Sequence, residues 1–572
     1  MPNKFQNFKD HFLALFLIFS LIITYHGIYR GLIVKADYAT TSVEVGNAVP
    51  SFTVDPHEDP ASTNTSPTNE GDNVTFKATA TDNNGDQWKL LICKTNGVTG
   101  TSCSSGTWCS SSYVNSGSEA SCSYLTQNSD SWSNDWYGFA CDSQGCSSVS
   151  QGSGDSGSPF YTNHRPTFTA ISDCGSANPN SSCLISASST DSDGTISLYV
   201  CKTAGFSTST PGCTGDTWCS VTGQSSNPSC TISNVPRPDG SYSYYPYIID
   251  SYKLTASSAL QGTEQTYDVN NVAPTIDASS IHLLDTDGSG YLTLLNENDW
   301  TPNFKVTFIV NDDNSCKTIT NGDEITSAII NVRMSEITQA QCDESGEYNA
   351  NNCYPAAYGS WNLVCAASST VNSCDGNTDT DVGWACTFPL QYHADPTVTG
   401  TPKASYNWIA AAKATDDDSA SSSLVDSTTY SNELDKFLAY DLATTTLAYG
   451  TVGPNQESSE KNTAVLATGN VGLDQNLSGT NMCTDYPTCS GDTIPVSQQH
   501  YNLTPGQGWS NGTALSTSTV EVELNCPKTT VTNNPASSTT YWILKIPTNQ
   551  PTGTYTGQNT IEGKVDNENY GS

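Results

Sequence analysis

One segment of the 572-residue chain places oxygen-bearing side chains at the alternating spacing of an EF-type calcium loop. Gly290 stands at the sixth position, where such a loop needs a sharp turn. The twelfth position, which normally supplies a bidentate carboxylate, is Asn296, and Glu297 follows one residue late. The segment therefore predicts either a structural calcium site or an ordinary hairpin turn rich in Asp and Gly. The predicted calcium ligands are Asp285, Asp287, Ser289, Tyr291 and Thr293.

Two shorter turns carry the same kind of ligand. Asp82-Asn-Asn-Gly85 and Asp191-Ser-Asp-Gly194 each offer carboxylate and amide oxygens in a tight loop. Hard divalent cations take such oxygens, so these turns could bind calcium between modules, although they are also common turn sequences. Calcium is the one cofactor that the sequence suggests, and no cofactor at all is the simpler expectation.

A catalytic site is harder to assemble from this sequence. The segment Gly154-Asp-Ser156-Gly-Ser-Pro159 differs by one residue from the sequence around the nucleophile of trypsin-like enzymes. Such enzymes need a histidine base, an aspartate that orients it and an oxyanion hole. His57 is the only histidine between residue 36 and Ser156, and its flanking residues do not resemble the segment that holds the base. We therefore expect no enzyme, and we keep as an alternative a secreted hydrolase with paired carboxylates.

The elements that would hold these residues repeat along the chain. The phrases Asn47-Ala-Val-Pro50, Asn163-His-Arg-Pro166 and Asn271-Val-Ala-Pro274 begin 116 and then 108 residues apart. A β-sandwich domain contains roughly 100 residues, so each interval fits one such domain. Internal repetition of this period indicates tandem modules rather than one large enzyme core.

Within the modules, apolar residues alternate with polar ones. Val74, Phe76, Ala78 and Ala80 follow this period of two, which is typical of half-buried antiparallel strands. Each module also has one strand rich in aromatic residues, which would fill the space between two sheets. The predicted fold class is therefore all-β, with tandem immunoglobulin-like β-sandwich modules and disulfides. The aromatic strands are followed by Asp142, Asp250 and Asp416.

Composition divides the chain into six segments. Boundaries fall at the repeated phrases and at stretches rich in Gly, Ser and Pro, which have the composition of linkers. The segments are a signal peptide or N-terminal anchor (1–36), module one (37–150), a Gly/Ser linker (151–159), module two (160–270), module three with insertions (271–430) and a β-rich C-terminal module, called region four (436–568).

The N-terminus predicts export. Lys4 and Lys9 precede an apolar stretch from Phe12 to Ile23, and Val34-Lys-Ala36 has the small and aliphatic residues of a cleavage site. Apolar character resumes before that site, so an uncleaved membrane anchor is the alternative. The formal net charge of −36 argues against nucleic acid as a partner, because phosphate binding needs clustered Lys and Arg.

The 21 cysteines fit an oxidising compartment, where they should form disulfides. Modules one and two share four cysteines at related spacing. Three connectivities are open within each set, and we favour sequential pairing because short loops bring those ends together most often. The shared positions are Cys93, Cys103, Cys109 and Cys122 in module one and Cys201, Cys213, Cys219 and Cys230 in module two.

Each of these modules has one further pair of its own. Because the four shared cysteines should bond among themselves, the further pair should close locally. Region four has three cysteines, of which the two nearest form the natural pair, so that Cys526 is left over, and we expect it to be a buried free thiol. The expected local pairs are Cys141 with Cys146, Cys174 with Cys183, and Cys483 with Cys489.

The Asn-x-x-Pro phrases, the Thr-Asp-x-Asn/Asp-Gly turns and the aromatic strands together resemble the immunoglobulin-like repeats of bacterial and archaeal surface proteins, in the broad PKD and cadherin-like group. Module three is similar to a domain of secreted proteins from small uncultured bacteria, through Val310-Asn-Asp-Asp-Asn-Ser-Cys316 and residues 386–397. Region four is similar to neighbours in such proteins through residues 469–474 and 541–547. The resemblance implies a fold and a location but hardly any activity.

The sequence thus predicts an exported, acidic repeat protein that is secreted or held at the cell surface. Its role would be structural or adhesive, without catalysis, and its partner would be a surface protein or a glycan. Two alternatives stay open. One is a calcium-binding adhesin that uses the loop at 285–296, and the other is a secreted hydrolase with accessory β-sandwich modules.

Overall fold

The computed structural model describes residues 41–343, 348–356, 361–428 and 432–567. The signal peptide or anchor predicted for residues 1–36 lies outside these ranges. Within them, no helix has the length and apolar character needed to cross a bilayer. The chain divides into two compact units between Thr162 and Asn163.

The described residues form β-strands throughout, which confirms the predicted all-β class. Helical structure in these residues is limited to short 3-10 turns, because no segment carries apolar residues at the helical spacing. These turns are η1 (Gly154–Ser156), η2 (Ala278–Ser280), η3 (Gln339–Gln341), η4 (Val496–Gln498) and η5 (Trp509–Asn511).

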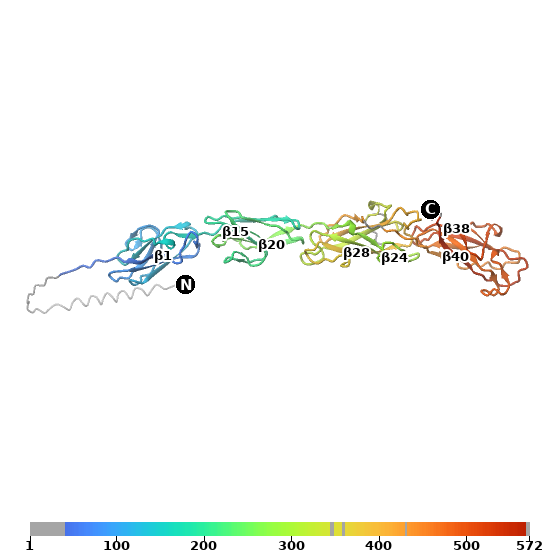
Figure 1. The fold of residues 1–572 in the computed structure, drawn as a ribbon, viewed down its shortest axis with the longest axis horizontal. Helices are drawn as coiled ribbons and strands as arrows, with labels where there is room; N and C mark the ends of the chain where they lie inside the picture. Colours follow the sequence, from blue (N-terminus) through green and yellow to red (C-terminus); the bar gives the residue numbers. More distant parts are fainter. Residues whose placement is uncertain (1–40, 344–347, 357–360, 429–431, 568–572) are drawn as a thin grey trace, which may run out of the picture. The chain divides into compact units, whose positions relative to one another are not determined.

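Module one is built from small antiparallel sheets in the orders β1-β3-β8, β10-β4-β7 and β2-β11-β9 (Figure 1). The alternation seen in the sequence becomes alternating burial along β3, and Phe76, Trp88 and Trp136 are fully buried in the core. Its strands are β1 (Ser51–Glu58), β2 (Thr68–Asn69), β3 (Asn73–Thr81), β4 (Lys89–Cys93), β5 (Val98–Thr99), β6 (Ser102–Cys103), β7 (Thr107–Ser110), β8 (Glu119–Leu125), β9 (Ser133–Asn134), β10 (Tyr137–Cys141) and β11 (Phe160–Asn163).

The linker predicted at 151–159 is wrong. Phe160 pairs with Asn134, so β11 is the last strand of module one rather than the start of module two. Phe160 is fully buried in the core of module one. The Gly- and Ser-rich stretch is a tightly packed connection between β10 and β11 inside the module. A side chain at Gly152 would collide with the carbonyl of Pro56. Composition alone does not distinguish a flexible linker between modules from a packed connection that needs small residues.

Module two consists of a three-stranded sheet, β12-β14-β19, and a five-stranded sheet, β13-β21-β20-β15-β18. Leu198, Tyr244 and Tyr267 are buried in its core. Its strands are β12 (Ala170–Ser172), β13 (Ser176–Ala177), β14 (Cys183–Ser188), β15 (Ile196–Cys201), β16 (Phe206–Ser207), β17 (Gly212–Cys213), β18 (Thr217–Gln224), β19 (Ser229–Ile232), β20 (Gly240–Asp250) and β21 (Gln265–Val269).

Module three has a sheet in the order β22-β24-β28-β27, with β23 also paired to β24, and a second sheet in the order β26-β25-β29-β30. Its long strands β24 and β28 pair with each other and lie side by side in Figure 1. Its core includes Phe304, Phe308 and Trp408. Its strands are β22 (Thr275–Ile276), β23 (His282–Leu284), β24 (Trp300–Asn311), β25 (Ile325–Met334), β26 (Cys353–Tyr354), β27 (Val364–Ala367), β28 (Asp381–Gln391), β29 (Trp408–Asp416) and β30 (Val425–Asp426).

Region four also consists of a five-stranded sheet, β31-β32-β39-β36-β37, and a three-stranded sheet, β38-β33-β40. Its strands are β31 (Tyr440–Leu442), β32 (Lys461–Ala467), β33 (Leu473–Gly479), β34 (Met482–Cys483), β35 (Thr493–Ile494), β36 (Gln499–Asn502), β37 (Thr513–Ala514), β38 (Val520–Cys526), β39 (Ser537–Leu544) and β40 (Asn559–Val565).

Disulfides join the strands and loops of every module. Both shared sets are paired sequentially, and Cys526 is a buried free thiol. In modules one and two, one disulfide of each set runs from one sheet to the other, between β7 and β8 and between β18 and β19. The pairs are 93–103, 109–122, 141–146, 174–183, 201–213, 219–230, 316–374, 342–353, 365–386 and 483–489.

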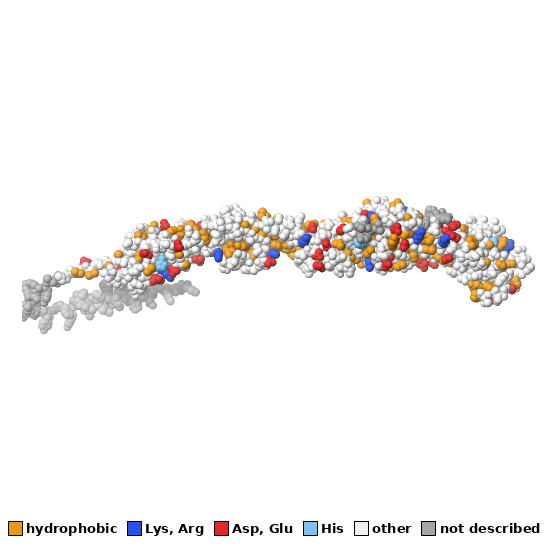
Figure 2. All heavy atoms as spheres, in the orientation of Figure 1, with side chains coloured by type: hydrophobic (Ala, Val, Ile, Leu, Met, Phe, Trp, Pro, Cys, Tyr) orange, Lys and Arg blue, Asp and Glu red, His pale blue; other side chains and the backbone are white. Residues whose placement is uncertain are grey.

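The surface of the described residues is polar but carries few charges. In the face that Figure 2 shows, most atoms are uncharged polar side chains or backbone, with scattered acidic groups and fewer basic ones.

Cross-links compensate for small cores, because closing a short loop removes conformational entropy from the unfolded chain, a gain on the order of 2–4 kcal/mol for each disulfide.

Candidate functional site

The predicted calcium loop at 285–296 is a hydrogen-bonded turn. The Asp287 carboxylate accepts a hydrogen bond from the Ser289 amide at 2.8 Å, and the Asp285 carboxylate faces the Thr293 amide at 3.4 Å. Gly288 takes the left-handed conformation that the turn requires. The Tyr291 side chain is exposed, and Asp285 is buried. Both carboxylates therefore face amides of the loop itself, and the binding of calcium by this loop stays a prediction.

The protease-like segment forms no recognisable catalytic arrangement. Ser156 ends the three-residue turn η1, and its carboxylate neighbour Asp155 is exposed. The His57 ring lies 3.0 Å from the carbonyl oxygen of Asp55, two residues away on β1. A histidine engaged with its own strand is not oriented by a carboxylate, as a catalytic base would be.

The three repeated boundary phrases make the same kind of contact. In each case the side-chain amide of the boundary asparagine donates a hydrogen bond to the aspartate that follows the aromatic strand. The pairs are Asn47 with Asp142 at 2.8 Å, Asn163 with Asp250 at 2.8 Å, and Asn271 with Asp416 at 3.1 Å. The aspartates are almost fully buried.

The Asp-containing turn joins the same arrangement. The amide of the residue after the boundary asparagine donates to the third residue of the turn, which is Asn84, Asp193 or Asn314. That residue's own amide then donates to the first aspartate of the turn. These second bonds run to Asp82 at 2.7 Å, Asp191 at 3.0 Å and Asp312 at 2.8 Å.

We call this arrangement the Asn–Asp pole of a module: boundary asparagine, turn, and aspartate after the aromatic strand. Its parts lie at three separate positions in the sequence of each module. The sequence shows the boundary asparagine and the aspartate after the aromatic strand in all three modules, and the repeated turn in modules one and two. The sequence does not show that these parts meet at one end of the module, because the contact joins residues about 90 to 145 positions apart. The pole is a scaffold of oxygen atoms held by backbone amides.

Carboxylates gather at two of these poles and at one place in region four. In each cluster, one oxygen from every member lies within 4.8 Å of the others. Among the described residues the clusters are Asp82 with Asp86 and Asp142, Asp239 with Glu324 and Asp417, and Asp474 with Glu521 and Glu523. The sequence motifs pointed to Asp82, whereas Asp239, Glu324 and Asp417 belong to no recognised motif.

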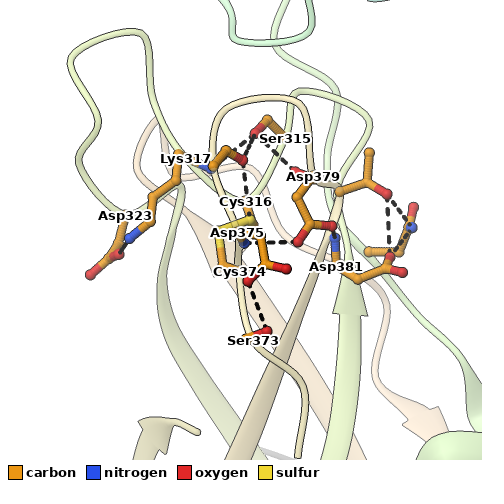
Figure 3. Close-up of a disulfide and its surroundings, with 12 residues drawn as sticks. Ser315, Cys316, Lys317, Asp323, Ser373, Cys374, Asp375, Asp379 and Asp381 are labelled. Atoms are coloured by element: carbon orange, nitrogen blue, oxygen red, sulfur yellow. Dashed lines mark hydrogen bonds and ion pairs between the residues drawn. A yellow bond between two sulfur atoms is a disulfide. The ribbon is translucent and has the colours of Figure 1, made fainter. Parts of the chain in front are cut away.

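A hairpin and a disulfide position Glu324. Residues 317 to 323 fold back on themselves, closed by an ion pair of 2.5 Å between Lys317 and Asp323. The Glu324 amide then donates to the carbonyl of Cys316. Cys316 is bonded to Cys374, and Figure 3 shows this disulfide beside the hairpin. The register of β25 with β29 pairs Ile325 with Asp416, which brings Glu324 next to the residues that follow β29.

A buried cation joins module three to region four. The Lys528 ammonium lies 3.0 Å from the Asp395 carboxylate and donates to the Asn351 side chain at 2.9 Å and to the His393 carbonyl at 2.6 Å. Burial lowers the pKa of Lys528, and the ion pair with Asp395 opposes this change. Burial and the nearby Lys528 lower the pKa of His393 to about 4, so this imidazole is neutral at physiological pH.

The described residues of region four form a hollow whose lining is as polar as it is apolar. It has a volume of about 460 Å³ and contains Tyr449, Met482, Ile546 and Tyr555 among its lining residues. None of its lining residues is a carboxylate or a histidine. Hydrolysis of a glycoside would need two carboxylates facing one cleft.

No protein-family model matches the chain, and no curated protein matches its sequence significantly. Among solved structures, the chain is similar to the N-terminal eight immunoglobulin domains of the Down syndrome cell adhesion molecule, at 9% identity over 91% of this chain and 69% of that one, with a TM-score of 0.17. It is also similar to the fibronectin(III)-like modules of Clostridium thermocellum CbhA, at 14% identity over 37% of this chain and 92% of that one, with a TM-score of 0.18.

A third similar structure is that of a 1.5-MDa bacterial ice-binding adhesin, at 14% identity over 68% of this chain and 100% of that one, with a TM-score of 0.20. At such scores the chains do not superimpose as wholes. The assignment of tandem immunoglobulin-like sandwiches therefore depends on the sheets and disulfides of this chain.

Proposed function

We propose that this chain is an exported, non-catalytic repeat protein that acts as a structural and adhesive element at the cell surface or outside the cell. The observation that carries the proposal is the Asn–Asp pole, which recurs at the start of three successive β-sandwich modules. A pole that repeats with each module suits a chain that gains length by adding modules.

The disulfides support an extracellular location. Ten disulfides in the described residues would not persist in a reducing cytosol. The net charge of −36 supports solubility in an exposed position and leaves a surface protein or a glycan as the partner class, rather than nucleic acid.

Surface location is tested on intact cells of the native host. A membrane-impermeant biotin reagent should label the chain, and sequencing of the mature N-terminus would separate a cleaved signal peptide from an anchor. Thiol alkylation under denaturing conditions should modify Cys526 alone among the described cysteines. A fully reduced chain that no external reagent reaches would contradict the proposal.

Adhesion is tested with beads that carry the purified, oxidised chain. The beads should bind to a subset of arrayed glycans or surface proteins, and beads carrying the reduced and alkylated chain should not. Binding that survives reduction, or turnover of an arrayed substrate, would count against a folded, non-catalytic adhesive module.

A calcium-binding adhesin is the second candidate function. The acidic cluster of Asp239, Glu324 and Asp417 favours it, independently of the loop at 285–296. In this version, bead binding requires calcium and is abolished by a chelator. Binding that is equal in calcium and in chelator leaves the structural and adhesive role in place but excludes the calcium-dependent version.

A further inference from the structure

The Asn–Asp pole of module three carries more acid than the other two poles. Asp312 follows β24, Glu324 precedes β25, and Asp416 ends β29. Asp417 follows Asp416 in the chain. Asp239, which directly precedes β20 of module two, lies beside Glu324 and Asp417. Carboxylates from four separate segments of the chain therefore converge on one point.

The segment that carries Asp239 is tied to this pole. The Asn314 side chain donates hydrogen bonds to the carbonyl of Asn270 at 2.9 Å and to the carbonyl of Arg237 at 3.1 Å. Arg237 in return donates to the carbonyl of Asp313 at 3.3 Å. The side chains of Asn314 and Arg237 thus hold the segment that carries Asp239 against module three, through hydrogen bonds to main-chain carbonyls.

Several oxygen atoms at this pole have no donor. Glu324 is fully buried, and neither of its carboxylate oxygens accepts a hydrogen bond from a donor among the described residues, although the Asp417 carboxylate lies within hydrogen-bonding range of Glu324. Asp312 is 1% exposed, and its Oδ2 is likewise without a partner, as is the Oδ1 of Asn271. Buried acceptors without donors are costly, because they have lost water and gained nothing in exchange.

The pKa values of these buried carboxyl groups also favour a bound cation. Burial first, and then repulsion from nearby aspartates, raises the pKa of Asp312 to about 7. The pKa of Glu324 is raised to about 9 by burial first, and then by repulsion from Asp239, Asp417, Asp312 and Asp416. A positive charge among these oxygens would replace this repulsion by attraction.

We propose that Asp239, Asp312, Glu324 and Asp417 form a binding site for one divalent cation of the calcium class. Calcium takes six to eight oxygen ligands at about 2.3–2.6 Å, so two oxygens on one ion lie at most about 5 Å apart. The carboxylate oxygens of Asp239, Glu324 and Asp417 meet this limit, since they lie within 4.8 Å of one another. The site offers oxygen and no nitrogen or sulfur ligand, which favours a hard cation over zinc or copper.

The site joins module two to module three. Asp239 belongs to the segment that leads into β20, and the other three ligands belong to module three. A bound cation would therefore hold the end of one sandwich to the start of the next. This inference goes beyond the proposed adhesive function and does not depend on it, because cation binding is measured without any adhesion partner.

The region-four cluster shows what a carboxylate group without such a site looks like. Glu521 and Glu523 are exposed, and Glu521 already pairs with Lys564. The Asp474 carboxylate accepts a hydrogen bond from the Asn525 amide at 3.0 Å. This cluster provides the matched control, because it has the same number of carboxylates but a cation and donors beside them.

The test is calorimetric titration of calcium chloride into the full-length, oxidised chain after removal of cations by a chelator. Glu324→Gln keeps the shape of the side chain and removes the carboxylate that would bind the cation. It should abolish one binding event or weaken it by at least about tenfold, as expected for loss of a ligand. Asp417→Asn, at the exposed rim of the site, should weaken the same event, and the control Glu523→Gln should leave it unchanged. Equal calcium binding by Glu324→Gln and the wild type would overturn the proposal.

Hydrogen exchange places the event and guards against a variant that fails to fold. In the wild type, calcium should slow exchange in peptides that span residues 236–242 and 312–326, and magnesium should slow it less. Without calcium, Glu324→Gln should exchange no faster than the wild type there, because it replaces a buried carboxyl group with a neutral amide of the same shape. Slower exchange of the wild type in calcium, absent in Glu324→Gln, supports the site. Unchanged exchange of the wild type overturns it.

Discussion

Two buried glutamates in different modules show opposite solutions to the same problem. Glu58 in module one is 1% exposed, and its carboxylate accepts hydrogen bonds from the Ser62 amide at 2.7 Å and from the Trp136 indole at 2.8 Å. Glu324 in module three is fully buried and has no donor on either oxygen. Burial raises the pKa of both, to about 7 for Glu58 and to about 9 for Glu324.

The difference separates a structural acid from a binding one. Fixed donors satisfy Glu58, so its carboxyl group is part of the packing of module one. The neighbours of Glu324 are other carboxylates, which repel its charged form in the absence of a cation. Similar burial therefore has different meanings, and the hydrogen-bond partners decide between them.

The largest expected effect is the loss of the Glu58 acceptor. Glu58→Ala leaves the Ser62 amide and the Trp136 indole without partners in the core, and should reduce the free energy of unfolding of module one by about 2–4 kcal/mol. Native-state hydrogen exchange of the β1 and β3 amides measures this change. Glu119→Ala, on the exposed side of β8, is the control and should have almost no effect. A loss as small as that of the control would mean that the carboxylate is not structural.

The second effect is a pH dependence of module one. Because the pKa of Glu58 is raised from 4.5 to about 7, the folded module retains a proton that the unfolded chain has lost between these values. Stability should therefore fall as the pH rises through this window, by about 1.4 kcal/mol per pH unit at most, and change little above it.

The same exchange measurement, made between pH 4.5 and pH 8 and corrected for intrinsic exchange rates, follows this fall. Glu58→Gln keeps an acceptor for the indole and cannot titrate, so its profile should lack the slope. A wild-type profile that rises with pH in this window would show that the proton is not retained.

The third effect compares two copies of the Asn–Asp pole. Asn163 is fully buried, whereas Asn47 is exposed, although both donate to an aspartate at 2.8 Å. Asn163→Ala should destabilise module two by about 1–2 kcal/mol, and Asn47→Ala should cost module one less than about 0.5 kcal/mol, because water replaces the lost donor there. Hydrogen exchange of the β14 and β3 amides, measured at increasing denaturant concentration, gives the free energy of unfolding of module two and module one in these variants. Equal costs would mean that burial does not set the strength of the pole.

The smallest effect is expected in the loop at 285–293. Asp287→Asn preserves a side-chain oxygen for the Ser289 amide, so the turn should retain its hydrogen exchange rate. Calcium should slow this loop less than the peptides around Glu324. Slowing of the loop by calcium that Asp287→Asn removes would instead establish the predicted EF-type site.

Local patterns predicted the fold of this chain well. The alternation of Val74, Phe76 and Ala78 predicted β3, and the related spacing of cysteines predicted the sequential disulfides of modules one and two. Both features depend on residues close in sequence, so a period of two or a short loop is enough to predict them. The linker at 151–159 failed because glycine and serine serve both free linkers and tightly packed crossings.

The sites depend on contacts that no local pattern contains. An all-β, disulfide-linked chain of repeated modules follows from local patterns, because strand periodicity and loop closure act over short separations. The meeting of Asp239, Glu324 and Asp417, and the burial of Lys528 against Asp395, arise only when the modules fold. Convergence of this kind follows from the order of strands in the sheets and from hydrogen bonds between segments far apart in the chain. Charge and burial at such a point are properties of the assembled module, not of any segment alone.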